Sequence, residues 1–239
     1  MLARFQPKQL QSQIEHKTME GASKRARARS LEATVTTINI PGLENPNGIF
    51  VLADGTLLVT TRQHTLLQIA LSGRLATIAG YAEKEEDAEA DEDEEEAQDG
   101  NMKGGYLHAM SARARFNTPS GLTVDWAGSV VVVDRGNHAL RTVSKAGAVD
   151  STLVGNGEEG SADGEGADAA FNDPFDVVLA ANGDLLMSND NTIRVVTPWG
   201  AVRTLAGSGQ AGFADGQDPV ARFNLPDTCW CLTTTRFAW

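Results

Sequence analysis

The side chains best suited to bind another molecule are arginines and amides that recur at matching places of a repeated pattern. They are Arg135, Asn137, His138, Arg141, Asn189, Asn191 and Arg194. If neighbouring repeats place their turns on one side, these side chains form a polar binding face. The competing interpretation is turn chemistry, because Asn and Asp tolerate left-handed backbone and bond to their own main chain.

Residue types that serve catalysis or metal binding form no recognisable pattern. The histidines are His16, His64, His108 and His138. They lack ligand spacing, and the sequence contains no Gly-x-Ser-x-Gly elbow or phosphate loop. The pair Cys229 and Cys231 supplies only two of the roughly four ligands that zinc needs. We therefore expect a chain that is not an enzyme and that holds no metal ion or cofactor.

The run from Asp163 to Asp168 is rich in Asp and Gly, which suggests calcium. It lacks the regular Asp spacing and the closing Glu of an EF-hand loop. We instead expect a structural loop that packs Phe171 or Phe213 between repeats.

The net charge of −12 is unevenly distributed along the chain. A basic cluster, Lys24, Arg25, Arg27 and Arg29, lies in a polar arm over residues 1–33 that we expect to be disordered. This patch is a candidate nuclear address, a site for acidic partners or part of a transit peptide. The segment 83–99 holds twelve acids and one lysine, and the rest of the chain is mildly acidic. Nucleic-acid binding is therefore disfavoured outside the arm.

The sequence also bears on compartment and membrane association. No run approaches the ~18 apolar residues of a membrane span, and the N-terminus lacks the apolar centre of a secretory signal. Only two cysteines are present, one residue apart, which is a poor basis for a disulfide scaffold. We expect an intracellular protein, cytoplasmic or nuclear, without membrane contact.

An internal repeat organises the chain. Gly157–Gly164 returns as Gly209–Gly216, 52 residues later, and Phe171–Pro174 returns as Phe223–Pro226 at the same offset. An earlier copy is Arg115–Pro119. Periods of this length indicate stacked supersecondary units.

Short β-type runs separated by turn residues fill each repeat. The predicted strands are 48–53, 56–60, 66–70 and 74–79, then 121–125, 129–134, 139–144 and 148–154, then 176–180, 184–188, 192–197 and 201–206. The β-branched run from Val130 to Val133 suits a strand that is buried on both faces. Each set of four antiparallel strands makes one small sheet.

These spacings divide the chain. Blades are expected at about 45–81, 116–156 and 171–208, within a repeat region over 34–227. An acidic insert at 82–105 separates the first two blades, where it accounts for the longer first interval. Residues 228–239 form an atypical tail.

The second unit closely resembles the NHL repeat. The resemblance rests on Ala114–Asp125, on Val131–Arg141 with its Asn137-His138-Ala139-Leu140 core, and on Gly147–Gly157. It is good in the third unit and weaker in the first, which keeps Asn45-Pro46-Asn47-Gly48 and His64 but not the Asp or the Arg. The chain also resembles plant and algal NHL proteins that carry a BTB adaptor domain. No BTB segment is visible in this sequence.

The resemblance implies an all-β fold, since NHL repeats form propeller blades, commonly six in a ring. We expect a partial, open β-propeller of about three four-stranded blades, part of a larger propeller, with a disordered arm and an acidic loop between blades. The family implies a scaffold for protein–protein interaction. The alternatives are a metal-dependent, gluconolactonase-type propeller hydrolase and the substrate-recognition part of a ubiquitin-ligase adaptor or an RNA binder. A protein partner and self-association through open blade edges are expected.

Overall fold

The structure is a computed structural model that describes residues 39–80, 114–144, 149–217 and 220–227 of the 239-residue chain. The chain divides into two units, 1–41 and 42–239, and every strand described below belongs to the second. Within the described residues, none of the helices combines the length and apolar character of a membrane crossing. The expected arm at 1–33, the acidic insert at 82–105 and the tail at 228–239 lie outside the described residues.

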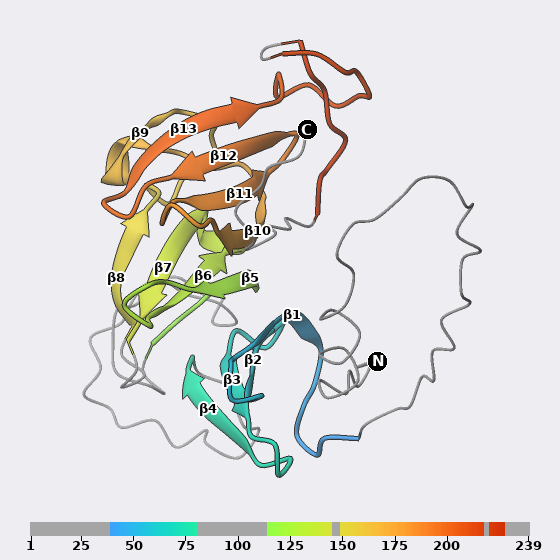
Figure 1. The fold of residues 1–239 in the computed structure, drawn as a ribbon, viewed down its shortest axis with the longest axis vertical. Coiled ribbons are helices and arrows are strands. Elements are labelled where there is room, and N and C mark those ends of the chain that lie inside the picture. Colours follow the sequence, from blue (N-terminus) through green and yellow to red (C-terminus); the bar gives the residue numbers. More distant parts are fainter. Residues whose placement is uncertain (1–38, 81–113, 145–148, 218–219, 228–239) are drawn as a thin grey trace, which may run out of the picture. The chain divides into compact units, whose positions relative to one another are not determined.

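Three antiparallel sheets follow one another along the chain (Figure 1). Blade 1 comprises β1 (Pro46–Val51), β2 (Leu57–Thr61), β3 (Leu66–Ile69) and β4 (Leu75–Ala79). Blade 2 comprises β5 (Pro119–Val124), β6 (Val130–Asp134), β7 (Ala139–Val143) and β8 (Val149–Val154). Blade 3 comprises β10 (Pro174–Leu179), β11 (Leu185–Asn189), β12 (Thr192–Val196) and β13 (Ala201–Ala206), with β9 (Gly164–Glu165) at its edge. The predicted all-β fold of propeller-like blades is confirmed.

Each blade is entered through the same backbone conformation. The residue before the first proline of the blade has a positive φ in all three blades, at Asn45, Thr118 and Asp173. Leu225, before Pro226, has the same conformation, so the fourth copy of the motif enters as the others do. A register shift then follows each proline, because a bulge separates Pro46, Pro119 and Pro174 from the regular ladder.

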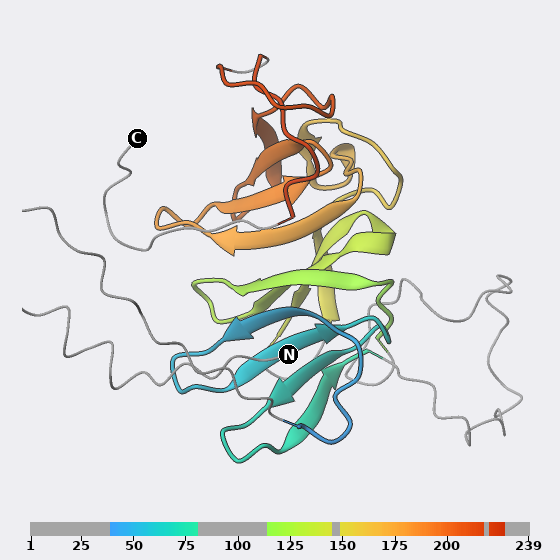
Figure 2. The ribbon, with the colours of Figure 1, turned by 90° about the vertical axis from the view of Figure 1, so that its right-hand side faces the viewer.

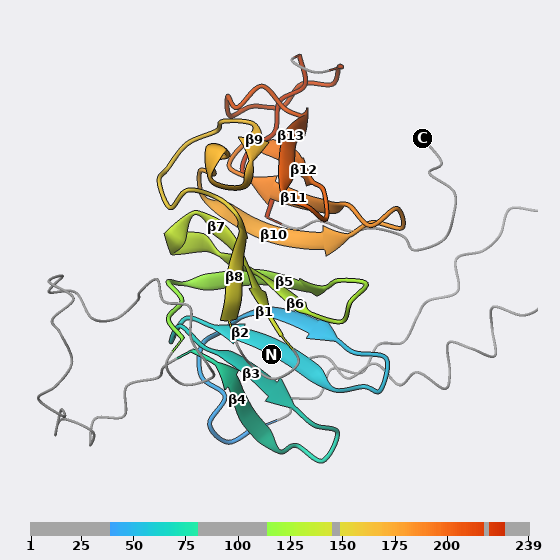
Figure 3. The same ribbon diagram turned by 90° about the vertical axis from the view of Figure 1, so that its left-hand side faces the viewer.

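Blade 2 lies between blades 1 and 3, and the valine run of β6 packs against both of them. Figures 2 and 3 show the sheets following one another, and the first strands β1, β5 and β10 lie in contact in that order. Val130 and Val132 belong to the apolar cluster shared with blade 1, whereas Val131 and Val133 belong to the cluster shared with blade 3. Side chains alternate across a strand, so the run fills two cores at once. The predicted burial of this strand on both faces is confirmed.

At each junction between two blades, one phenylalanine is buried in the apolar cluster. Phe116 lies fully buried between blades 1 and 2, and Phe171 lies fully buried between blades 2 and 3. The expectation that Phe171 or Phe213 packs between repeats is confirmed for Phe171 and not for Phe213, because the Phe213 side chain is 94% exposed. The repeat explains the difference: Phe223 is the counterpart of Phe171, while Phe213 stands where the preceding copy has Ser161.

The third sheet differs from the expected four strands by the addition of β9. Glu165 pairs with Ala201 and Gly164 with Val202, which extends the sheet beyond β13. The neighbouring carboxylate of Asp163 accepts hydrogen bonds from the N–H and the hydroxyl of Thr204 on β13. This anchor holds the Gly-rich loop against the outer strand, where it becomes a fifth strand.

Candidate functional site

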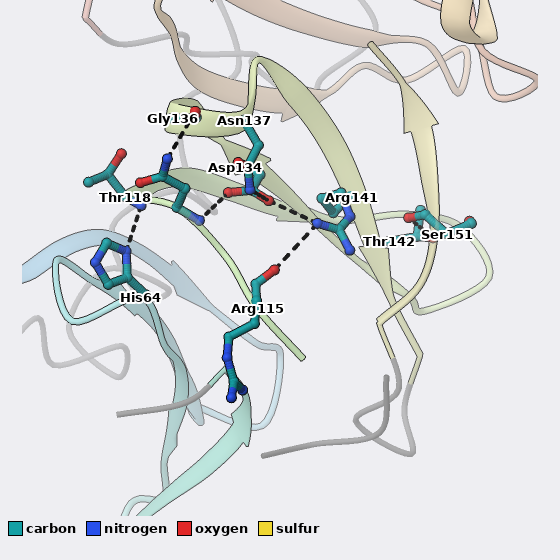
Figure 4. Close-up of polar contacts among 10 residues, drawn as sticks. His64, Arg115, Thr118, Asp134, Gly136, Asn137, Arg141, Thr142 and Ser151 are labelled. Carbon is teal, nitrogen blue, oxygen red and sulfur yellow. Dashed lines mark hydrogen bonds and ion pairs between the residues drawn. The ribbon is translucent and has the colours of Figure 1, made fainter. Parts of the chain in front are cut away.

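The turn between the second and third strands of blade 2 is built around a buried carboxylate (Figure 4). Asp134 ends β6, and its Oδ1 accepts the backbone N–H of Asn117 at 2.7 Å. Its Oδ2 accepts Asn137 Nδ2 at 2.8 Å and Arg141 Nη1 at 3.0 Å. The turn also bonds to the entry segment directly, because Gly136 N–H donates to Asn117 O at 2.8 Å. Asp134 therefore ties the start of the blade to its turn.

Asp134 and Arg141 form an ion pair whose two side chains are both fully buried. Arg141 also approaches the Arg115 carbonyl oxygen at 3.5 Å and lies over the Phe116 ring at 5.9 Å from its centroid. Burial raises the pKa of Asp134 to about 6, although the hydrogen bonds from Asn117 and Asn137 and the charge of Arg141 act to lower it. The pair belongs to the junction between blades rather than to an exposed surface.

Blade 3 has an arginine at the position of Arg141, but its carboxylate partner comes from the Gly-rich loop and not from the neighbouring strand. Asn189 occupies the position of Asp134 and accepts the N–H of Asn172 at 2.9 Å. Arg194, the counterpart of Arg141, lies over the Phe171 ring and pairs through Nη2 with Asp163 Oδ1 at 2.7 Å. Burial raises the pKa of Asp163, but the hydrogen bonds from Thr204 and the Arg194 guanidinium outweigh it and hold the pKa below its usual value.

Sequence reasoning missed the role of Asp163. The available signal was a mismatch between repeats, because the acid at 134 becomes Asn189 while the arginine persists as Arg194. A buried guanidinium without a carboxylate is costly, so a replacement acid had to lie nearby. Blade 1 has no ion pair at the equivalent positions. Thr61 replaces Asp134 there and Leu67 replaces Arg141, so neither position carries a charge.

These positions correct part of the expected binding face. Arg141 and Arg194 are fully buried, and Asn189 and Asn191 are buried as well. Their side chains hold backbone groups and carboxylates within the blade junctions, which is why they do not reach an open surface. Arg135, Asn137 and His138 are half-buried. The basic patch at Lys24, Arg25, Arg27 and Arg29 lies outside the described residues.

Arg135 reaches across from blade 2 to blade 3. Its Nη2 donates to Asp173 Oδ2 at 2.8 Å, its Nε donates to Asp173 Oδ1, and the guanidinium lies over the Phe175 ring at 5.0 Å from the centroid. Asp227 adds its charge, because Asp173 and Asp227 both raise the pKa of Arg135. This bidentate contact lies at the rim of a polar cavity of about 210 Å³. The lining residues are Arg135, Asp173, Phe175, Asp190, Leu225, Pro226 and Asp227.

A second contact between blades uses a turn side chain as a hydrogen-bond acceptor. His64 Nδ1, in the β2–β3 turn, accepts the N–H of Thr118 at 2.8 Å (Figure 4). Asn191 Oδ1, in the corresponding turn of blade 3, accepts the N–H of Leu225 at 3.0 Å. In both cases the donor is the residue before the entry proline of the next repeat. We call this contact the entry latch.

The entry latch of His64 is expected to weaken in acid. Burial lowers the pKa of His64, and Nδ1 can accept a hydrogen bond only while it carries no proton. Because the pKa of His64 is lower in the folded than in the unfolded state, this hydrogen bond stabilises the fold fully above about pH 6.5. Its contribution to the free energy of unfolding is lost as the pH falls through the folded pKa. His64→Asn, which copies Asn191, keeps an acceptor that does not titrate. The acid-induced fall in the free energy of urea unfolding is expected to shrink by about 0.5–1.5 kcal/mol in this variant. An unchanged pH dependence would contradict the latch.

The Asp163 loop offers a matched pair of variants. Asp163→Ala leaves the buried guanidinium of Arg194 without its carboxylate, and we expect a loss of about 1–3 kcal/mol in the free energy of unfolding. Asp215 is the counterpart of Asp163 in the next copy of the motif and is exposed. Asp215→Ala is expected to change stability by less than about 0.5 kcal/mol. Equal losses in urea unfolding would show that Arg194 does not depend on Asp163.

Comparison with known proteins agrees with this geometry. The NHL repeat family matches residues 116–142, which span β5 to β7. A search of curated proteins gave no significant match.

The chain is similar in fold to longer solved structures. A structural genomics protein of unknown function from Bacteroides thetaiotaomicron matches with a TM-score of 0.58 and 14% identity, over 79% of this chain and 42% of that one. An auxiliary nutrient binding protein from Bacteroides ovatus matches with a TM-score of 0.54 and 17% identity, over 79% and 43%. The chain thus spans less than half the length of these proteins, and at such identities the likeness shows the fold alone.

The matched segment contains Asn117, Asp134, Asn137 and Arg141, so it coincides with the part of the chain that closes the blade 2 junctions. The chain thus contains one recognised NHL repeat, which lies in the middle one of three propeller-like blades.

Proposed function

We propose that the chain is a non-catalytic NHL-repeat scaffold that binds a protein partner at the turn end of blades 2 and 3. The observation that carries the proposal is the polar cavity beside Arg135, where two blades and the fourth entry segment meet. Asp173 is engaged by Arg135, whereas Asp190 and Asp227 add two further carboxylates to the lining. A partner loop with a basic side chain suits this lining, and its binding would weaken with salt.

The arrangement of the other polar side chains supports a scaffold over an enzyme. Asp134, Arg141, Asp163 and Arg194, which could serve catalysis in an open site, are used in contacts within and between blades. Over the described ranges, no group of three or more His, Cys, Asp or Glu side chains is arranged to hold a metal ion. A hydrolase of the gluconolactonase type would need such a convergent set.

The proposal is tested by partner capture with a charge-reversed cavity. The immobilised chain is compared with Asp190→Lys/Asp227→Lys and with Glu158→Lys, an exposed position outside the cavity. We expect a bound protein whose recovery falls at least about tenfold in the double variant, because two attractive charges become repulsive, and is unchanged in the control.

Three results would oppose the proposal. If the Asp190→Lys/Asp227→Lys variant captures the same proteins with unchanged recovery, the binding surface lies outside the cavity. Lactone hydrolysis by the purified chain with a stoichiometric bound metal would favour the hydrolase alternative. A salt-sensitive complex with RNA that requires Lys24, Arg25, Arg27 and Arg29 would favour the RNA-binding alternative.

A further inference from the structure

Two tryptophans stand exposed at the tips of hairpin turns. Trp126 lies in the β5–β6 turn and Trp199 in the β12–β13 turn, and their side chains are 72% and 71% exposed. A side chain left in water contributes almost no burial energy to the fold. Large apolar groups that gather on one exposed surface mark sites of interaction with other molecules. The two indoles are therefore candidates for a binding surface.

The repeat shows that the turns themselves do not require tryptophan. Five hairpin turns close in the same way, because the N–H of a glycine with positive φ donates to the carbonyl oxygen three residues earlier. These glycines are Gly55, Gly73, Gly128, Gly183 and Gly200. At the position of Trp126 two other turns have Ala53 and Ala181. At the position of Trp199 the β3–β4 turn has Ser72, so small residues serve the turn equally well.

The rings of two neighbouring blades meet around Gly183. A Cβ placed on this glycine would lie 3.3 Å from Trp126 Nε1 and 3.7 Å from Pro198 Cγ, so both rings lie against it. Pro198 is exposed and directly precedes Trp199. The β5–β6 and β10–β11 turns project on the same side of the sheets (Figures 2 and 3). We call the side chains of Trp126, Pro198 and Trp199 the ring platform.

The polar side chains of these turns are already used within the turns. Asn182 Nδ2 donates to Asp184 Oδ2 at 2.7 Å, and Asn182 Oδ1 accepts the Asp184 N–H at 3.2 Å. Asp125 Oδ1 accepts the N–H of Ser129 at 2.8 Å. None of the three turns contains Lys or Arg. The platform therefore offers a ligand ring faces and indole N–H donors, beside carboxylates and without cations.

We propose that the ring platform binds a proline-rich segment of a partner protein in the polyproline II conformation. Such a segment presents pyrrolidine rings and carbonyl oxygens, and its prolines have no N–H to satisfy. Aromatic side chains recognise this conformation in several unrelated domains. A sugar would leave hydroxyl groups without partners here, because the polar groups of the turns are engaged. A nucleic acid would meet carboxylates where its phosphates need cations.

The ring platform is separate from the cavity beside Arg135. The two surfaces lie at opposite ends of β6, because the β5–β6 turn precedes this strand and the turn that carries Arg135 follows it. Different variants report on each surface. Failure of one proposal therefore leaves the other standing.

The first test is a titration of the native chain with a labelled decaproline peptide, acetylated and amidated so that it carries no charge. We expect saturable binding by fluorescence anisotropy, with a Kd below about 1 mM. A Gly-Ser peptide of the same length should not bind, because a flexible coil loses more conformational entropy on ordering. The indole N–H signals of Trp126 and Trp199 should shift in NMR spectra as decaproline is added. A native chain that does not bind decaproline up to about 2 mM, or that binds both peptides alike, overturns the proposal.

Variants that copy the equivalent turns then locate the surface. Trp126→Ala and Trp199→Ser are each expected to weaken decaproline binding at least about tenfold and to leave the midpoint of urea unfolding unchanged. Trp126→Phe keeps a ring but lacks the N–H, so its loss should be smaller. Leu71→Ser is the matched control, since Leu71 is 80% exposed in the β3–β4 turn and lies outside the platform. Unchanged binding in both folded tryptophan variants, or an equal loss in Leu71→Ser, would overturn the surface.

Competing ligands and the other surface are tested in the same way. Maltohexaose or decathymidine that binds more tightly than decaproline, and is lost in the same tryptophan variants, would overturn the ligand class. The cavity variant Asp190→Lys/Asp227→Lys should bind decaproline as the native chain does, and a loss there would move the peptide to the cavity. Circular dichroism identifies any variant that fails to fold, and the NMR shifts of the native chain decide independently of the variants.

Discussion

Replacing Arg141 by leucine is expected to lower the free energy of urea unfolding by about 3–5 kcal/mol at pH 8. The substitution leaves the fully buried carboxylate of Asp134 without its cation, and an uncompensated buried charge is the most costly outcome of breaking such a pair. The stacking of the guanidinium on Phe116 is lost as well.

The loss should depend on pH in a defined direction. Arg141 lowers the pKa of Asp134, so its removal raises that pKa further above its value of about 6 in the intact protein. The unfolded carboxyl titrates near pH 3.9. The folded state therefore binds the proton over a range in which the unfolded state has released it, and the variant loses stability as the pH rises through the folded pKa. We expect a smaller loss at pH 5 than at pH 8, and equal losses would contradict the buried-charge explanation.

Blade 1 supplies the matched control for this experiment. Thr61 and Leu67 occupy the positions of Asp134 and Arg141 there, without a buried ion pair. The double variant Asp134→Thr/Arg141→Leu is expected to recover most of the stability, because replacing both members of a buried pair with uncharged groups is often neutral. A double variant as unstable as Arg141→Leu would show that the loss comes from packing rather than from charge.

Phe171→Ala is expected to lower the free energy of unfolding by about 3–5 kcal/mol, the usual range for removing a buried aromatic side chain. The ring lies fully buried in the cluster between blades 2 and 3, so its loss opens a cavity there. Urea unfolding followed by circular dichroism measures the effect. Because this cluster joins two blades, the variant tests how strongly they depend on each other.

Phe213→Ser is the control, since it copies Ser161 of the preceding repeat. Phe213 is 94% exposed, so this change should alter stability by no more than about 0.5 kcal/mol. A large loss from Phe213→Ser would mean that this phenylalanine, and not Phe223, is the true counterpart of Phe171.

The strands and their order follow from local sequence. Each predicted strand overlaps an observed one within a few residues, because alternation along a strand and turn residues between strands act over short distances. The valine run of β6 likewise predicted a strand that is buried on both faces. The entry conformation was harder to predict, because a positive φ before proline, as at Thr118 and Asp173, departs from the usual preference of that position.

The sequence by itself determined the repeat, the strands and their order, and the residue types at each turn. Only the tertiary structure decided what those residues do. Arg141 and Arg194 look alike in the repeat, yet one pairs with Asp134 from its own sheet and the other with Asp163, 31 residues away in the Gly-rich loop. His64 meets Thr118 across 54 residues. Such choices depend on which groups meet through space and lose their water together, which no local pattern encodes.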